Sequence, residues 1–360
     1  MTPTAPRLRS CALLALLLCP GGALANDTAF GGHASRPYPI TSEAVEMVRE
    51  QVTLKLVGHD RWEVRCRFLF RNATDRPVAL RMGFPFAGNR GEGDLAVPRG
   101  LKAPPEGRPL VWRFRATVRG KPVATKLRRL DDRRRSLGLD WAHIWPVRLG
   151  PGQKVRVDNS YVLGVTQTSM AFLTEVSYLL RTGANWRGGR IGRSRLVVTA
   201  DRPFLPCDGQ AVRARMLGRT FQRGRVLAGF ARPAEPAGFR IVRAGKRGPA
   251  RRIEWDLRSF APTKDLRACL VPASLHVLWL DYQLDSIDER KLDPAQLRLL
   301  INYHFAKHGK AFRSRDLRRY FGKRWWYRPD PRFTSARLSK GDWAKVKHLR
   351  AVLAQKKGRD

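Results

Sequence analysis

The sequence predicts a mainly β protein that ends in a small α domain: β-sandwich regions followed by a three-helix domain. Two hydrophobic periods carry this prediction. From Gln51 to about Tyr161, apolar residues alternate with polar ones, as in strands with one buried and one solvated face. After about Ser286 the period becomes 3.6, which is typical of amphipathic helices.

The first strands are short alternating runs that end at turn residues. Residues 52–56 alternate, the turn GHD follows, and residues 62–70 alternate again before the turn RNATD. A third run covers 78–84, and strand character returns after a long loop at 111–127 and 145–164. The number and spacing of these runs favour a β-sandwich over a closed barrel.

A second β-rich block begins near Ser177 and continues through the run LRACLVPASLHVLWL, with Pro and Gly clusters between its strands. It is either a smaller sandwich or an extension of the first. We therefore divide the chain into a sandwich domain over 26–170, a second β-rich subdomain over 171–285, and a helical domain over 286–357.

The helical domain contains three sets of start and stop signals. Asp293 begins a capping box with a proline at the first helical position, and Gly309 follows the last periodic residue. Ser314 precedes a short helix that ends at Gly322. Ser339 opens a third capping box, and the helix that follows it runs toward Lys357.

Residues 1–25 have the features of a signal peptide. Arg7 and Arg9 precede an apolar run over 11–18, and the small-x-small triplet Ala23-Leu24-Ala25 predicts cleavage before Asn26. No later apolar run has the length that a membrane-spanning helix needs. The sequence thus predicts an exported protein, periplasmic or extracellular, that has no transmembrane helix and can associate with the envelope.

The composition is strongly basic. The chain has 70 Lys and Arg against 30 Asp and Glu; removal of the two leader arginines leaves 68 against 30, a net charge of +38. Such a charge attracts polyanions, among which phosphorylated lipids and acidic cell-wall polymers are favoured over nucleic acid. A partner protein is the alternative, and a coding bias toward arginine would equally account for 54 Arg against 16 Lys.

Three cysteines follow the predicted cleavage point. Cys207 and Cys269 both lie in the second β block, and an exported location permits a disulfide between them. Cys66 alternates with Val64 and Phe68, so we expect it to be a small buried side chain. The cysteine and histidine spacings do not predict a zinc site.

The last fifth of the chain carries the candidate site residues. Arg315, Arg318 and Arg319 share one face of the short helix, and Lys323 and Arg324 follow it. From residue 291 onward there are 20 basic and 5 acidic residues, a net of +15. This stripe predicts a surface for an anionic ligand, with a merely solvated helix face as the alternative.

Two histidines of the same domain suggest an alternative, enzymatic function. His304 and His308 are four residues apart, a spacing at which one helix face can chelate a metal. A metal-dependent envelope hydrolase, or its regulator, is therefore the alternative function. Both histidines also lie on the apolar stripe of their helix, where hydrogen-bonded core histidines are expected. Because no other catalytic motif is present, we expect a non-enzymatic protein without a cofactor or a metal.

Residues 297–357 resemble the YARHG domain, an extracellular bacterial module. The match is carried by Phe305-Ala306-Lys307-His308-Gly309 and by Trp326-Tyr327 in the run WYRP. Phe305 and Lys307 stand where the signature has Tyr and Arg. The β region, about 26–273, is similar to the secreted-protein family DUF4424 in pieces such as ANDTAFGG and WDLRSFAPT. Both resemblances imply structural roles for these residues and no assigned activity.

Overall fold

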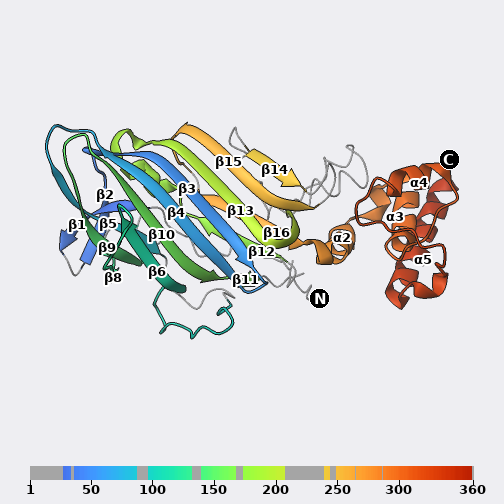
Figure 1. The fold of residues 1–360 in the computed structure, drawn as a ribbon. Helices are drawn as coiled ribbons and strands as arrows, with labels where there is room; N and C mark the ends of the chain where they lie inside the picture. Colours follow the sequence, from blue (N-terminus) through green and yellow to red (C-terminus); the bar gives the residue numbers. More distant parts are fainter. Residues whose placement is uncertain are drawn as a thin grey trace, which may run out of the picture.

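The structure is a computed structural model, and it describes residues 27–33, 36–86, 96–131, 139–167, 173–206, 239–243, 249–263, 265–285 and 287–358. A large β-sandwich occupies most of the molecule, and a helical domain continues from one end of it (Figure 1). This arrangement confirms the predicted fold class, a mainly β protein with a C-terminal α domain.

The smaller sheet has five strands in the order β2-β1-β5-β9-β8, and every neighbouring pair is antiparallel. These strands are β1 Thr28–His33, β2 Arg36–Ile40, β5 Val78–Phe86, β8 Lys126–Arg129 and β9 Trp141–Leu149. The antiparallel pair of β5 and β9 lies inside this sheet, and β2 and β8 are its edge strands.

The larger sheet has eleven strands, in the order β11-β12-β16-β13-β3-β4-β10-β6-β7, with β15 paired to β13 and β14 to β15. The bounds are β3 Val45–Val57, β4 Arg61–Asn72, β6 Val111–Val118, β7 Lys121–Val123, β10 Lys154–Gly164, β11 Thr166–Gln167, β12 Thr174–Tyr178, β13 Ile191–Pro206, β14 Phe239–Arg243, β15 Ala250–Phe260 and β16 Leu266–Pro272. Two 3-10 turns, η2 Arg181–Asn185 and η3 Arg187–Gly189, join β12 to β13.

One parallel pairing joins the two β blocks of the sequence. Strand β13 lies beside β3 from Ile191 opposite Met47 to Ala200 opposite Leu56. The sequence left open whether the second β block, over 171–285, forms a smaller sandwich or extends the first. In the structure its strands continue the larger sheet of the first block.

The alternating residues form the core of the sandwich. In β4, Trp62, Val64, Cys66, Phe68 and Phe70 are all buried, and the residues between them face outward. The same period places the apolar side chains of β3 and β10 on the inner face of the sheet. A single hydrophobic cluster runs through both sheets.

The helical domain has four α-helices within the described residues, one more than the sequence predicted. They are α2 His276–Asp285, α3 Pro294–Ala306, α4 Arg315–Phe321 and α5 Lys340–Lys357, with 3-10 turns η5 Ala273–Leu275, η6 Glu289–Lys291 and η7 Ser335–Arg337. Helix α2 lies where the sequence predicted the end of the second β block. Its Trp279, Leu280 and Leu284 are buried in the same cluster as α3 and α5, so the helical domain begins ten residues before the expected boundary at 286.

The sequence predicted a buried Cys66, a disulfide between Cys207 and Cys269, and a signal peptide over residues 1–25. Cys66 is buried and free, and Cys269 is disulfide-bonded. Its expected partner Cys207 lies outside the described residues, as does the predicted signal peptide over 1–25. None of the helices in the described part of the chain combines the length and the apolar character that crossing a membrane requires.

Candidate functional site

The carboxylate of Asp342 joins the C-terminal end of α3 to the start of α5. Its Oδ1 lies 2.9 Å from His304 Nδ1 and 2.6 Å from Lys307 Nζ, and its Oδ2 lies 2.8 Å from His308 Nε2. Ser339 Oγ donates to Oδ2 at 2.8 Å. The capping box of α5 adds the Ser339 N–H, which donates to the same oxygen at 3.4 Å, while the Asp342 N–H donates to Ser339 Oγ at 3.1 Å. The Asp342 side chain is only 7% exposed, so this charged cluster lies inside the domain.

The cluster stabilises its own charges. Burial by itself would raise the pKa of Asp342, but hydrogen bonds from Lys307, His304, His308 and Ser339 outweigh it and hold that pKa well below its usual range. Burial likewise opposes the charge of Lys307, and its bonds to Asp342 and Asp281 still raise the lysine pKa. The carboxylate therefore remains ionised and saturated with donors, which makes it a structural group and a poor proton acceptor.

A second acid extends the cluster to α2. Lys307 Nζ lies 2.9 Å from both carboxylate oxygens of Asp281, and Tyr303 OH donates to the same carboxylate at 2.9 Å. One lysine thus connects acids on α2 and α5 from its position at the end of α3. This geometry explains why the signature position 307 needs a long cationic side chain.

The remaining signature residues shape the turn after α3. Gly309 has φ of +92°, and a Cβ there would lie 3.1 Å from the Arg328 carbonyl oxygen, so glycine is required. Its own carbonyl accepts from Asp330 N at 2.8 Å, and Tyr327 OH donates to the Lys310 carbonyl at 2.7 Å. The other three, Phe305, Ala306 and Trp326, lie in or against the helical core.

The histidine pair has different contacts from those of a metal site. His304 and His308 each use one ring nitrogen on Asp342, and burial lowers the pKa of His304. Within the described ranges, no group of three or more His, Cys, Asp or Glu side chains is placed to hold a metal ion. The pair is an internal bridge between two helices.

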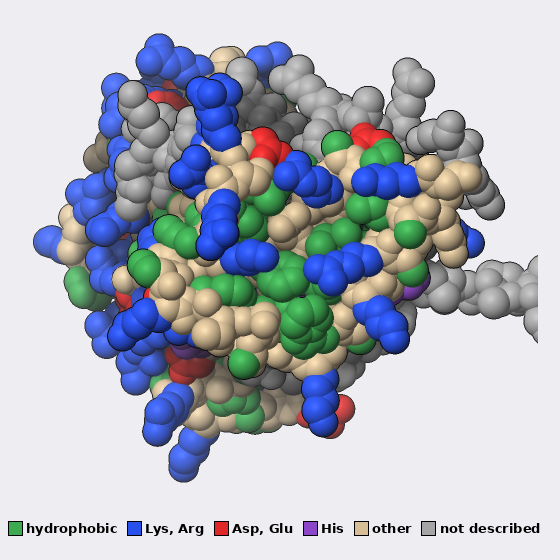
Figure 2. All heavy atoms as spheres, turned by 90° about the vertical axis from the view of Figure 1, so that its right-hand side faces the viewer, with side chains coloured by type: hydrophobic (Ala, Val, Ile, Leu, Met, Phe, Trp, Pro, Cys, Tyr) green, Lys and Arg blue, Asp and Glu red, His purple; other side chains and the backbone are tan. Residues whose placement is uncertain are grey.

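The predicted arginine stripe lies on the surface. Arg315, Arg318, Arg319 and Lys323 are exposed, and across the described residues none of the four forms an ion pair. Arg324 instead stacks over the Tyr320 ring, 4.3 Å from its centroid. Figure 2 shows Lys and Arg side chains distributed over this end of the molecule, with hydrophobic side chains between them and few acids.

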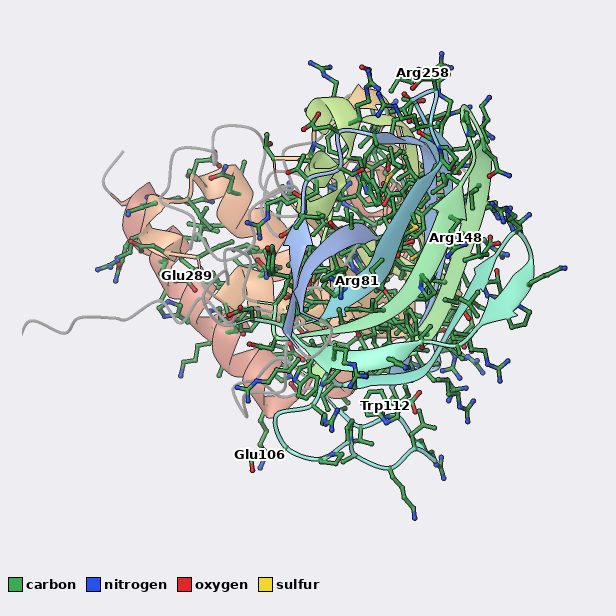
Figure 3. The ribbon with its side chains drawn as sticks, turned by 90° about the vertical axis from the view of Figure 1, so that its left-hand side faces the viewer. Arg81, Glu106, Trp112, Arg148, Arg258 and Glu289 are labelled. Atoms are coloured by element: carbon green, nitrogen blue, oxygen red, sulfur yellow. The ribbon has the colours of Figure 1, made fainter. Side chains whose placement is uncertain are left out.

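Arginines also cover the other end of the molecule. Figure 3 shows Arg81 and Arg148 on β5 and β9 of the smaller sheet, and Arg258 on β15. A basic exterior is therefore general to this chain. What distinguishes the α4 stripe is that three guanidinium groups on one helical face form no ion pair with any described residue.

Sequence reasoning did not find the two acids of the ion cluster. Asp342 was identified only as part of the capping box that Ser339 opens, and Asp281 directly follows the run LRACLVPASLHVLWL, inside the predicted β-rich subdomain over 171–285. A usable signal was available: an acid at the third position of a helix, after a capping serine, can lie within reach of the neighbouring helix. His304 and His308 lie 38 and 34 residues before Asp342, so local sequence patterns did not reveal their contact.

Two family models match separate parts of the chain. The YARHG domain matches residues 276–353, and the domain of unknown function DUF4424 matches residues 25–132. The first match includes α2, in agreement with the boundary that the structure shows. No curated protein matches the chain.

Among solved structures, a protein from Legionella pneumophila described as a "putative nutrient binding protein" is 28% identical, with a TM-score of 0.58, and the match covers 93% of this chain and 99% of that one. An M1 zinc metallopeptidase from Deinococcus radiodurans is 10% identical over 65% of this chain and 44% of that one, with a TM-score of 0.27. The chain therefore carries a YARHG domain at its C-terminal end and a DUF4424 domain in its N-terminal region.

Proposed function

We propose that this chain is an exported, non-catalytic binding protein whose helical domain contacts an anionic ligand of the bacterial envelope. The observation that carries the proposal is the stripe of Arg315, Arg318 and Arg319, exposed and without ion pairs among the described residues. Unpaired arginines on one face contribute little to folding but match phosphate and carboxylate oxygens. The YARHG domain is an extracellular module, which agrees with an envelope setting.

Export is the second part of the proposal. Cleavage before Asn26 would remove Arg7, Arg9 and the apolar run over 11–18, and the DUF4424 match begins at residue 25, next to the predicted cleavage point. Mass spectrometry of the protein isolated from its natural host checks this step. A mature N-terminus at Asn26 is expected, and an intact Met1 or a lipidated Cys19 would contradict it.

The ligand is expected to be recognised through charge and through the bidentate geometry of guanidinium. Lys323 lies just beyond the helix and adds a fourth exposed cation. Binding should therefore weaken steeply as salt is raised, because exposed charges are screened within about 8–10 Å at moderate ionic strength. Phosphorylated lipid and acidic cell-wall polymer both offer this chemistry.

The test compares two triple variants of the full chain. Arg315→Gln, Arg318→Gln and Arg319→Gln together remove the stripe, while Lys126→Gln, Arg128→Gln and Arg129→Gln remove three exposed charges from the edge strand β8. Binding is measured to vesicles of phosphatidylglycerol and of phosphatidylcholine, and to purified acidic cell-wall polymer, at two salt concentrations.

The stripe variant should lose at least tenfold in affinity for one of the anionic probes and show a weaker salt dependence. The β8 variant, with the same change in net charge, should stay within about threefold of the unmodified protein. Equal losses in both variants would mean that net charge alone drives binding, and would contradict a specific surface on α4.

Binding of a small solute is a second candidate function. It is favoured by the full-length match to the Legionella protein, whose description names nutrient binding. A rise in melting temperature with a particular solute from a nutrient panel, retained in the stripe variant, would support this function for the sandwich.

A further inference from the structure

The outer face of the larger sheet carries three arginines in line on adjacent strands. Strand β3 places Arg49 directly opposite Arg193 of β13, and Arg193 lies directly opposite Arg258 of β15. All three side chains are exposed, whereas the next residues along β3 and β13, Glu50 and Ser194, are buried in the core. Figure 3 shows Arg258 on the outside of the sandwich. We refer to these three residues as the arginine row.

The register of the row sets like charges against one another. Neighbouring strands are about 4.8 Å apart, so side chains in directly opposite positions lie close together. Like charges in such positions destabilise a sheet. The row repeats this arrangement twice, from Arg49 to Arg193 and from Arg193 to Arg258. An oxyanion bound over the row would turn this repulsion into attraction.

Elsewhere on the same face, carboxylates of the chain neutralise the arginines. Asp158 of β10 lies 3.1 Å from Arg67 Nε and 2.7 Å from Arg156 Nε, so one carboxylate bridges two guanidinium groups. Arg71 Nε likewise lies 2.6 Å from Glu46 Oε1. An oxyanion placed against guanidinium groups is therefore an arrangement that this sheet already uses.

The arginine row has one carboxylate of this kind. Arg193 donates to Asp256 from Nε at 2.9 Å and from Nη2 at 2.7 Å, so each oxygen of that acid receives a bond from Arg193. The hydrogen bond from Arg193 holds the pKa of Asp256 below its usual value, and the charge of Arg258 contributes only at longer range. Neither Arg49 nor Arg258 forms an ion pair or hydrogen bond with any described residue.

Arg49 lies among four other arginines. On β4, Arg67 and Arg71 flank the position opposite Arg49, and on β13 Arg193 lies opposite it with Arg195 two residues further along. Three of the four acids that pair with these neighbours belong to β10 and β15, one strand further out. The centre of the face is therefore cationic, and its acids lie mainly toward the sides.

We propose that the arginine row is a second anion-binding surface, located on the sandwich, and that its ligand is a linear polyanion lying across β3, β13 and β15. Guanidinium groups bind phosphate and carboxylate oxygens alike. Three of them on successive strands, repeating at about 4.8 Å, match a polymer with repeated oxyanions better than a single small ion. This surface does not depend on the α4 stripe.

A polymer fits this face better than a membrane does. The described helices lie at one end of the sandwich, so none of them covers the strands of the row (Figure 1). Membrane-surface binding combines charge with apolar side chains that enter the bilayer. Among the described residues, the exposed large hydrophobic side chains are Val97, Leu278, Tyr282 and Trp343, and none of them belongs to β3, β13 or β15.

The test compares two double variants of the full chain. Arg49→Gln with Arg258→Gln removes the two members of the row that lack an ion pair, and Arg65→Gln with Arg115→Gln is the matched control. Arg65 and Arg115 are exposed on the same face and form no ion pair with any described residue. They lie on either side of Ser160, so neither is directly opposite another arginine.

Binding is measured to long-chain polyphosphate, to polygalacturonate and to phosphatidylglycerol vesicles, each at two salt concentrations. The row variant should lose at least tenfold in affinity for one or both polymers, while the control variant stays within about threefold of the unmodified chain. The polymer that binds more tightly identifies phosphate or carboxylate as the preferred group. Equal losses in the two variants, a loss confined to the vesicles, or no binding of either polymer would overturn the proposal.

A second measurement needs no ligand. At low salt, Arg49→Gln should raise the melting temperature by about 1–3 °C, because it removes one charge from a like-charge pair. Arg65→Gln, which has no arginine opposite, should change it by less than about 1 °C. Equal shifts in the two variants would overturn the view that the row is repulsive without a ligand.

Failure of the α4 surface is separately visible. The row substitutions are also introduced into the chain that carries Arg315→Gln, Arg318→Gln and Arg319→Gln. Polymer binding that persists in the stripe variant and is lost when the row is also replaced would assign it to the sandwich. Polymer binding that is already lost in the stripe variant, with the row variant unchanged, would leave the α4 surface intact and overturn the row.

Discussion

The two domains of this protein bury carboxylates in opposite ways. In the helical domain, Asp342 is surrounded by Lys307, His304 and His308, and its pKa is depressed. In the sandwich, Glu50 has only hydroxyl donors, and burial raises its pKa to about 7. The first site holds an ionised carboxylate among cationic side chains, while burial in the second site favours the protonated acid. The same buried group can therefore stabilise one core and destabilise another, depending on its partners.

The largest expected effect comes from removing Asp342. Asp342→Ala leaves two histidines without their acceptor, leaves Lys307 with Asp281 as its remaining acid, and removes part of a capping box, so the helical domain should lose about 3–5 kcal/mol of unfolding free energy. Hydrogen exchange of α3 and α5 in increasing urea measures the loss. Asp285→Ala is the control, because that side chain is 64% exposed and lies 3.4 Å from Lys345; it should cost less than about 0.5 kcal/mol. Similar losses of unfolding free energy in the two variants would show that the ion cluster does not stabilise the helical domain.

The pH dependence of the sandwich is the next largest effect. Because the pKa of Glu50 rises from 4.5 to about 7 on folding, the folded state binds this proton more tightly. The corresponding stability is complete below pH 4.5 and is lost as the pH rises through about 7, a change of about 3 kcal/mol. Urea unfolding of the chain from pH 4 to 8 measures it.

Glu50→Gln should flatten that profile, and Glu106→Gln, at an exposed carboxyl group, should leave it as in the unmodified chain. A sandwich stability that rises with pH between about 4.5 and 7 would contradict the raised pKa of Glu50.

A smaller effect is expected at the glycine turn of the helical domain. Gly309→Ala forces a left-handed backbone on alanine and places Cβ 3.1 Å from a carbonyl oxygen, which should cost about 1–2 kcal/mol. Gly341→Ala provides the matched control. Its Cβ would meet only Ser339 Oγ at 3.7 Å, and alanine is favoured inside a helix, so the change should be neutral or slightly stabilising. Thermal unfolding of both variants checks the difference.

The smallest effect on stability is expected from the α4 stripe. Arg315→Gln, Arg318→Gln and Arg319→Gln together should change the unfolding free energy by less than about 1 kcal/mol, since these side chains are exposed and make no ion pairs among the described residues. Urea unfolding checks this. A larger loss would show that the stripe stabilises the fold and would weaken its assignment as a binding surface.

The sequence predicted the architecture better than the partners of charged groups. Alternation in β4 and the capping signals of α3 and α5 identified those elements, because period and caps are local properties. Helix α2 was read as a strand, since a short apolar run such as LHVLWL does not distinguish the two structures by period. Only its packing against α3 and α5 makes it helical.

The sequence could have located Glu50 in the core, but not its hydrogen-bond partners. Alternation backward from Val52 places Glu50 on the inner face, yet the strand was predicted to begin at Gln51. Its donors Ser194 and Tyr178 lie more than a hundred residues away. The parallel pairing of β13 with β3 places Ser194 opposite Glu50, whereas Tyr178 comes from β12, which pairs with β16. Long-range contacts of this kind depend on the topology of the sheet, which periodicity does not encode.

The central claim is that the helical domain holds Asp342 ionised among cationic partners, whereas burial in the sandwich favours the protonated form of Glu50. Hydrogen exchange at pH 5 and at pH 8, corrected for the intrinsic exchange rate at each pH, tests both halves in one molecule. The account predicts that amides of β3 and β13 lose protection at pH 8, by at least tenfold, and that amides of α3 and α5 keep theirs. Unchanged protection in β3 and β13, or an equal loss in the helices, would contradict it.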